Sequence, residues 1–75
     1  MKKPVLESEL KVGMLILNKN SRKRVIYTII GEKQPPEGFR KSYVIHSSDG
    51  DVFGYDIPNG RVSNYPFLYD GEILG

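Results

Sequence analysis

The chain contains no cysteine and no tryptophan, and it has a single histidine. The absence of cysteine excludes disulfides and thiolate metal sites, which small secreted domains usually need because their cores are small. No apolar run approaches the roughly 20 residues that a membrane-spanning helix requires. The Met1–Lys3 start is similar to the basic end of a signal peptide, but Pro4, Glu7 and Glu9 interrupt the apolar region that would have to follow. We therefore expect a soluble protein of the cytoplasm that contacts no membrane.

The motifs of common enzymes are also absent. The chain has no G-x-S-x-G elbow, no Walker loop and no G-x-G-x-x-G run. His46 and Asp49 lie close in sequence, but a catalytic dyad also needs a nucleophile and a pocket, for which 75 residues leave little interior. We expect no enzymatic activity, no catalytic residue and no cofactor.

The acidic run from Asp49 to Asp56 begins like a calcium-binding loop. An EF-hand loop requires Asp or Asn at its fifth position and Glu at its twelfth. Phe53 and Gly60 occupy those positions here. The alternating apolar residues favour a turn followed by a strand, and we expect no metal site.

Short β-branched and aromatic runs, separated by turn formers, predict an antiparallel β protein that forms one small domain over residues 1–75. A chain of this length buries only about 60% of its unfolded surface, so its stability should be marginal. The expected strands cover residues 14–17, 25–30, 42–46, 52–56 and 61–65, and residues 67–69 and 72–74 close the fold as a hairpin or an edge strand. Residues 6–10 form at most one helical turn.

Individual positions have expected roles within this pattern. Val25, Tyr27 and Ile29 share one face of the strongest strand, because side chains alternate along a strand. Gly54, inside its strand, indicates a bulge or a close backbone approach. A long polar loop is expected over Gly31–Lys41. The expected core consists of Val12, Met14 or Leu15, Ile16, Val25, Tyr27, Ile29, Tyr43, Ile45, Phe53, Val62, Leu68 and Ile73.

The segment Leu10–Ile16, followed by Arg24–Ile29, resembles the first two strands of SH3-like barrels of the KOW and Tudor kind. In those barrels a valine-glycine pair opens an apolar first strand, and a polar loop leads into a β-branched second strand. Asn20-Ser21 stands where the KOW loop carries a glycine. The resemblance spans residues 10–30 and implies shape alone. The predicted fold is all-β, either a small SH3-like barrel or a strongly bent five-stranded antiparallel sheet.

Charge is sorted along the chain. Residues 1–45 contain 10 Lys/Arg and 4 Asp/Glu, a net charge of +6, whereas residues 46–75 contain 1 and 5, a net charge of −4. Four cations of the basic part cluster within residues 19–24: Lys19, Arg22, Lys23 and Arg24. On a hairpin tip such a cluster could neutralise phosphates or meet an acidic protein. It is equally typical of a solvated tip that keeps a sheet edge from aggregating.

The aromatic residues offer a second set of candidates. Most of the five tyrosines and three phenylalanines are expected in the core, although Tyr43, Tyr55 and Asp56 could contribute to a methyl-lysine cage. Phe39 is the exception, because it falls in the expected polar loop beside two cations and could be a contact residue or a lid. The full set of candidate binding residues is Lys19, Arg22, Lys23, Arg24, Phe39, Arg40 and Lys41.

These features favour a small non-enzymatic binding module that acts through protein–protein interaction. Its compact size would suit a phage or mobile-element accessory protein that modulates a larger machine. The alternative is a nucleic-acid-binding module that uses the basic 19–24 loop, which the acidic second half disfavours because it must be held away from phosphates. An exposed sheet edge offers a further route to partners by strand addition, including a homodimer.

Overall fold

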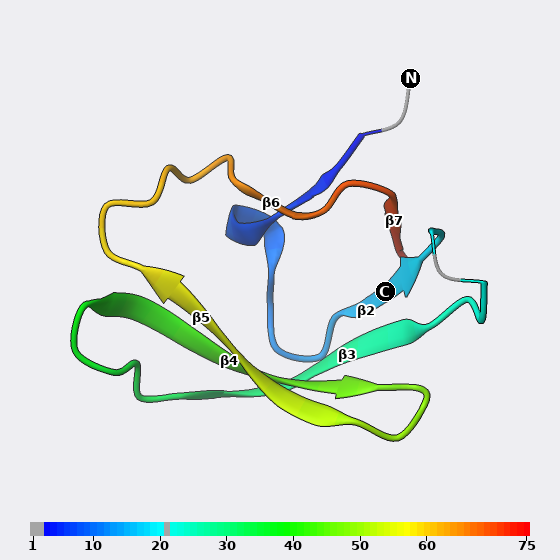
Figure 1. Cartoon of the computed structure of the whole chain (residues 1–75), viewed down its shortest axis with the longest axis horizontal. Helices are drawn as coiled ribbons and strands as arrows, with labels where there is room; N and C mark the ends of the chain where they lie inside the picture. Colours follow the sequence, from blue (N-terminus) through cyan, green and yellow to red (C-terminus); the bar gives the residue numbers. More distant parts are fainter. Residues whose placement is uncertain (1–2, 21) are drawn as a thin grey trace.

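The computed structural model describes residues 3–20 and 22–75; Met1 and Lys2 of the basic start, and Ser21 within the basic cluster, lie outside the described residues. The described part of the chain forms strands and one turn of 3-10 helix, which lies between the first two strands (Figure 1). The elements are β1 (Val5–Leu6), η1 (Glu7–Glu9), β2 (Leu15–Asn18), β3 (Ile26–Lys33), β4 (Phe39–Ser47), β5 (Val52–Pro58), β6 (Pro66–Leu68) and β7 (Gly71–Ile73). The helical turn lies inside the predicted range of residues 6–10.

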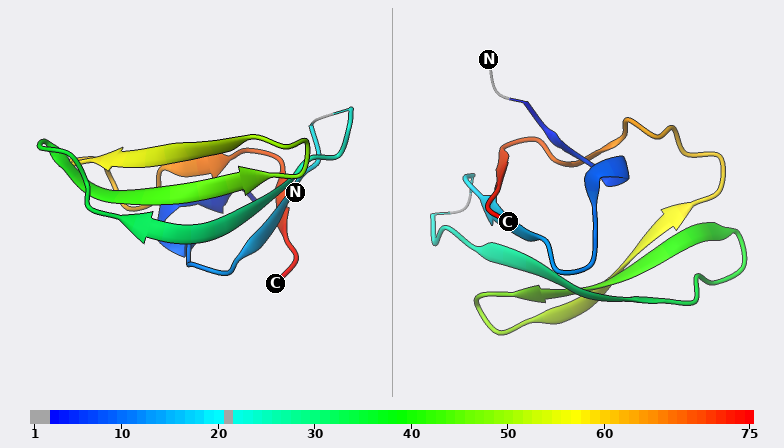
Figure 2. Two further views of the ribbon diagram at one scale, coloured as in Figure 1. Left: turned by 90° about the horizontal axis from the view of Figure 1, so that it is seen from below. Right: turned by 180° about the vertical axis from the view of Figure 1, so that it is seen from behind.

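The predicted all-β class is confirmed. Five strands form an antiparallel sheet in the order β5-β4-β3-β2-β7, and β1 pairs with β6 in a separate two-stranded sheet. In the described part of the chain, β5 pairs only with β4 and β7 only with β2, so the ladder does not close into a barrel. The five-stranded sheet is therefore the correct one of the two predicted shapes. Figure 2 shows β5 at one margin, followed by β4 and β3.

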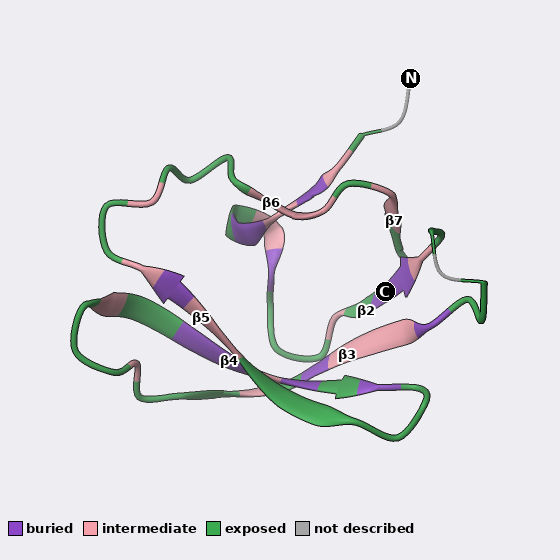
Figure 3. Ribbon diagram, in the orientation of Figure 1, coloured by how far each residue is buried: buried purple, intermediate pink, exposed green. Residues whose placement is uncertain are grey.

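The core lies between one face of the sheet and a cover formed by β1, η1 and β6. Figure 1 shows this cover above β3–β5. Ile16, Ile29 and Ile45 are fully buried, and the ring of Phe67 packs edge-on against Tyr55 at 4.9 Å between centroids. The facing predicted for Tyr27 and Ile29 is confirmed, because Ile29 belongs to the core and Tyr27, which is half-buried, packs against it. Val25 is also buried, but it precedes β3 and lies outside this core cluster. Figure 3 shows the buried positions on β1, η1, β2, β4 and β5 around this centre.

Part of the predicted core is wrong. The exposed members are Val12, Phe53, Val62 and Ile73, with exposed fractions between 38% and 60%. Of the alternatives Met14 and Leu15, Met14 packs against the core and Leu15 is exposed. Val12 lies in the turn before β2, Ile73 lies on an edge strand, and Val62 lies in a segment that forms no strand. The core instead includes four residues that the pattern did not place there: Val5, Leu10, Leu17 and Ile57.

The predicted strand over residues 61–65 is also wrong. Its backbone turns, with the amide of Tyr65 donating to the carbonyl of Val62, and the amide of Glu7 donates to the carbonyl of Tyr65 at 2.8 Å. The segment is irregular because it packs against η1 rather than against another strand. Residues 67–69 and 72–74 do not form a hairpin with each other, since β6 pairs with β1 and β7 pairs with β2 as an edge strand.

The predicted loop over Gly31–Lys41 is shorter in the structure. β3 continues to Lys33 and β4 begins at Phe39, so only residues 34–38 connect them. Phe39 is therefore in a strand, paired with Pro58, and the loop position expected for it is wrong. A bulge between Ile29 and Gly31 lets β3 extend past the expected end. The bulge or close backbone approach predicted at Gly54 is wrong: the irregularity between β4 and β5 lies between Phe39 and Lys41, and the group nearest to a Cβ at Gly54 would be the side-chain Nζ of Lys33, at 3.0 Å.

The burial of β3 generates a prediction from two neighbouring isoleucines. Ile29 is fully buried and Ile30 is 51% exposed. Ile29→Ala should lower the free energy of unfolding by about 2–4 kcal/mol, because it leaves a cavity in the core. Ile30→Ala should cost less than about 1 kcal/mol. Urea unfolding followed by circular dichroism measures both, and an equal or larger loss for Ile30→Ala would reverse the facing of the strand.

Candidate functional site

The basic cluster lies at the connection between β2 and β3. Lys19, Arg22, Lys23 and Arg24 are all exposed. Arg24 has a φ of 50°, a left-handed conformation that is uncommon for residues other than glycine. The turn returns the chain so that the amide of Asn18 donates to the carbonyl of Val25 at 2.8 Å. The predicted hairpin-tip position of the cluster is therefore confirmed.

The acidic end of the chain folds against this tip. Lys19 Nζ lies 2.9 Å from Glu72 Oε1, and the amide of Lys19 donates to the carbonyl of Asp70 at 2.9 Å. Both side chains of the ion pair are about half exposed, so the pair itself contributes little to stability. Its electrostatic effect is still relevant, because charges that are sorted in the sequence are mixed in space. The field that the tip presents to a phosphate backbone is weakened accordingly.

The other candidate residues lie at the opposite end of the molecule, where β4 begins (Figure 1). Phe39 is only half-buried there, against Pro58. Arg40 Nη1 donates to the carbonyl of Arg61 at 2.8 Å, and Lys41 Nζ lies 3.6 Å from Glu32 Oε1. The seven predicted site residues thus form two separate groups, and each group contains cations that already bind partners within the protein.

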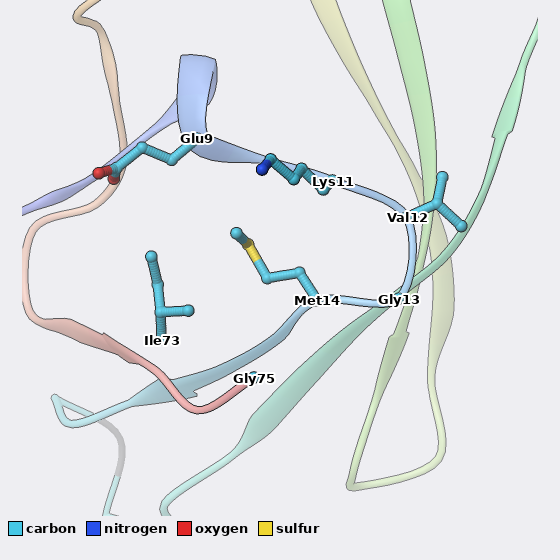
Figure 4. A pocket seen from close by; sticks show the side chains of 7 residues that line it. All are labelled: Glu9, Lys11, Val12, Gly13, Met14, Ile73 and Gly75. Atoms are coloured by element: carbon cyan, nitrogen blue, oxygen red, sulfur yellow. The ribbon is translucent and has the colours of Figure 1, made fainter.

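A groove lies between the turn before β2 and the end of β7 (Figure 4). Its volume is about 520 Å³, and its lining is mostly apolar. The residues that line this groove are Glu9, Lys11, Val12, Gly13, Met14, Ile73 and Gly75. A shallower hollow of about 190 Å³ adjoins it and shares Glu9 and Ile73. Figure 4 shows the side chains of Lys11, Met14 and Ile73 pointing into a common space.

The backbone explains why the groove exists. Gly13, with a φ of 92°, turns the chain after Lys11, a conformation that favours glycine. The amide of Gly13 donates to the carbonyl of Ile29 at 2.7 Å, which ties this turn to β3. On the other side, the amide of Leu74 donates to the carbonyl of Leu15 at 2.8 Å, which holds the chain after β7. Two fixed segments therefore form its walls.

The charges at the groove rim differ in how far they are already neutralised. Glu9 Oε2 accepts from the amide of Leu6 at 2.9 Å, and Glu9 Oε1 lies 3.9 Å from Lys3 Nζ. Lys11 is exposed and has no ion-pair partner among the described residues. The groove therefore combines an apolar floor with one available cation. Sequence reasoning missed it, because Val12, Met14 and Ile73 follow the same apolar pattern as core residues.

A buried polar cluster supports the segment above the sheet. The carboxylate of Glu7 is fully inaccessible, accepts a hydrogen bond from the hydroxyl of Tyr55 and lies 3.0 Å from Arg61 Nη1. The second oxygen of Glu7 has no protein partner among the described residues. The guanidinium of Arg61 also stacks on the ring of Tyr65 at 4.1 Å. Burial, and then the hydrogen bond to Glu7, raise the pKa of the Tyr55 hydroxyl.

This cluster has the features of a structural site. Neither hollow described above is lined by Glu7, Tyr55 or Arg61. His46 and Asp49, the residues considered for a dyad, do not bond to each other: His46 is exposed, and Asp49 Oδ1 accepts from the hydroxyl of Ser47. Within the described ranges no three His, Cys, Asp or Glu residues lie close enough together to hold a metal ion.

Comparison with known proteins adds no relative. No protein-family model matches the chain, and neither a curated protein nor a solved structure matches it. Residues 3–20 and 22–75 include no helix that is long and apolar enough to cross a membrane. The groove and the cluster must therefore be interpreted from their own geometry.

The buried ion pair predicts an asymmetry between its two partners. Arg61→Met leaves the inaccessible Glu7 carboxylate with only the Tyr55 hydroxyl, and should lower the free energy of unfolding by about 2–4 kcal/mol. Glu7→Gln should cost about 1–2 kcal/mol, because Arg61 is partly exposed and water can solvate it. Chemical denaturation of both variants tests this, and a larger loss for Glu7→Gln would contradict it.

The raised pKa of Tyr55 predicts a loss of stability in alkali. Unfolded tyrosine releases its proton near pH ~10, whereas folded Tyr55 retains it to higher pH. The unfolded state then binds fewer protons, so stability declines as the pH rises above that value. Denaturant midpoints measured between about pH 8 and pH 11 should fall less steeply for Tyr55→Phe than for the wild type. Tyr69→Phe, at a highly exposed tyrosine, is the control and should leave the slope nearly unchanged.

Proposed function

We propose that the protein is a small non-enzymatic binding module that acts through protein–protein interaction, with the groove as its contact surface. The observation that carries this proposal is an open, mostly apolar groove of about 520 Å³ in a domain of only 75 residues. Concave apolar sites with few polar groups are typical of binding sites. Such a module would suit a phage or mobile-element accessory protein that modulates a larger machine.

Two exposed apolar side chains belong to the groove. Val12 and Ile73 line it, with exposed fractions of 52% and 44%. Exposed apolar side chains gathered in one groove support a contact surface, because scattered exposed apolar residues are common but clustered ones are not.

The charge at the rim defines the chemistry of the partner. Since Glu9 is already bound to Leu6 and Lys3, the available charge is the ammonium of Lys11. A protein segment that fits would place an apolar side chain between Met14 and Ile73 and an aspartate or glutamate beside Lys11. Apolar burial would supply most of the affinity, and the acidic group would orient the segment.

The second candidate function is nucleic-acid binding at the basic tip. The exposure of Arg22, Lys23 and Arg24 at a hairpin tip favours it. The ion pair between Lys19 and Glu72 disfavours it, because an acid lies where a phosphate would approach. Three or four phosphate contacts would give a log–log salt slope of about −3 on duplex DNA.

A displayed library of random short peptides, selected against the immobilised protein, tests the proposal. We expect the retained peptides to carry an apolar residue next to Asp or Glu. For a retained peptide, Ile73→Ser should weaken binding about tenfold or more, because it removes one wall of the groove. Val62→Ser is the matched control, since Val62 is 60% exposed and lies outside the groove, and it should leave binding unchanged.

Charge reversals separate the two candidate functions. Lys11→Glu should abolish peptide binding and leave any DNA binding unaffected. Arg22→Glu should abolish any DNA binding and leave peptide binding unaffected. Near physiological salt we expect no detectable binding to duplex DNA. Salt-dependent DNA binding that Arg22→Glu removes, together with a library that yields no groove-dependent peptide, would establish the nucleic-acid function instead.

A further inference from the structure

The outer edge of β5 is an unpaired strand edge. β5 pairs only with β4 in the part of the chain that the structure describes, and Figure 2 shows it at the margin of the sheet. The amide of Ser47 donates to the carbonyl of Asp51, so this pair and every second pair after it are hydrogen-bonded across β4 and β5. The backbone groups of Val52, Gly54 and Asp56 consequently point outward, away from β4.

This edge carries little of the protection that strand edges usually have. Val52 is 61% exposed and Phe53 is 38% exposed, so apolar side chains occupy the start of the edge. Proteins commonly protect edges with charges, bulges or proline. Here Pro58 closes only the far end of the strand, and the two charges beside residues 52–56, Asp56 and the Lys33 ammonium over Gly54, are opposite in sign.

We infer that two copies of this chain pair antiparallel along β5, with the two-fold axis between the Gly54 residues. The edge shares no residue with the groove, so this dimer is independent of the proposed function. In this arrangement Gly54 opposes Gly54 of the second copy, and Val52 opposes Asp56 of the second copy. Each of the three outward-facing positions then exchanges hydrogen bonds with a position that also faces outward.

The two other registers that centre on an outward-facing residue are worse. Centring the pair on Asp56 would oppose two carboxylates and would place Pro58, which has no amide proton, opposite Gly54. Centring it on Val52 would extend the ladder into the turn at Gly50, which has a φ of 102°. Centring it on Gly54 avoids both problems.

Side chains complement each other in the chosen register. On the inner face, Phe53 lies opposite Tyr55 of the second copy, and cross-strand aromatic pairs stabilise antiparallel sheets. On the outer face, Lys33 Nζ lies over Gly54, 3.0 Å from where a Cβ would be. Asp56 of the second copy is diagonal to Gly54 and therefore near this ammonium. The two-fold axis repeats this opposite-charge contact, which gives the edge self-complementary charge.

Two substitutions at one exposed position test the register. Val52→Glu places a carboxylate opposite Asp56 of the second copy and should raise the dimer dissociation constant roughly tenfold, because the like-charge pair occurs twice. Val52→Lys places an ammonium there and should leave the constant unchanged or lower it. Sedimentation equilibrium from micromolar to millimolar concentration measures both, with circular dichroism to show that each variant is folded. A monomer throughout for the wild type, or equal effects of the two substitutions, would overturn the proposal.

The lack of native cysteine permits a direct check of the axis. Gly54→Cys places two thiols across the two-fold axis, at a hydrogen-bonded pair whose Cα atoms are about 5.5 Å apart, within disulfide range. Mild oxidation should give a covalent dimer. Asn20→Cys, an exposed residue near the basic tip, is the control and should remain monomeric under the same conditions. Crosslinking of the control to the same extent, or none at Gly54→Cys, would place the contact elsewhere.

Discussion

One buried carboxylate holds together the parts of this protein that the main sheet does not pair. Glu7 of η1 accepts from Tyr55 of β5 and binds Arg61, while its amide donates to the carbonyl of Tyr65. These contacts attach the irregular segment around residues 61–65 and the helical turn to the sheet. The packing of Phe67 on Tyr55, and thus the cover over the core, depends on the same positions.

The folding of the chain also redistributes its charge. The acidic end lies beside the basic tip, where Lys19 and Glu72 form an ion pair, and Glu32 and Lys41 meet at the other end of the molecule. The acid at the tip is paired with one of its four cations, which weakens the field that the tip presents to nucleic acid but leaves Arg22, Lys23 and Arg24 exposed.

Small size explains why two separate surfaces stay open. A folded chain of 75 residues has too little interior to bury every apolar side chain, and Val12, Val52 and Ile73 are exposed. The groove results from a glycine turn held against the chain after β7, and the β5 edge results from a sheet that does not close. The groove would bind a partner through its apolar, concave surface, whereas the β5 edge would bind one through backbone hydrogen bonds. The two surfaces would therefore bind different partners.

Local chemistry alone determined much of this protein. The short β-branched and aromatic runs and the turn at Asp49-Gly50 were sufficient to predict the all-β class, the positions of β2 to β5 along the chain and the burial of Ile29 on β3. Periodicity could not tell Val12 and Ile73 from core residues, because an apolar side chain looks the same in a groove wall and in an interior. Nor could it place Glu7, whose burial depends on Tyr55 and Arg61, 48 and 54 residues away in the chain. Those positions were decided only by tertiary structure, because the partners that make them favourable meet only when the chain has folded.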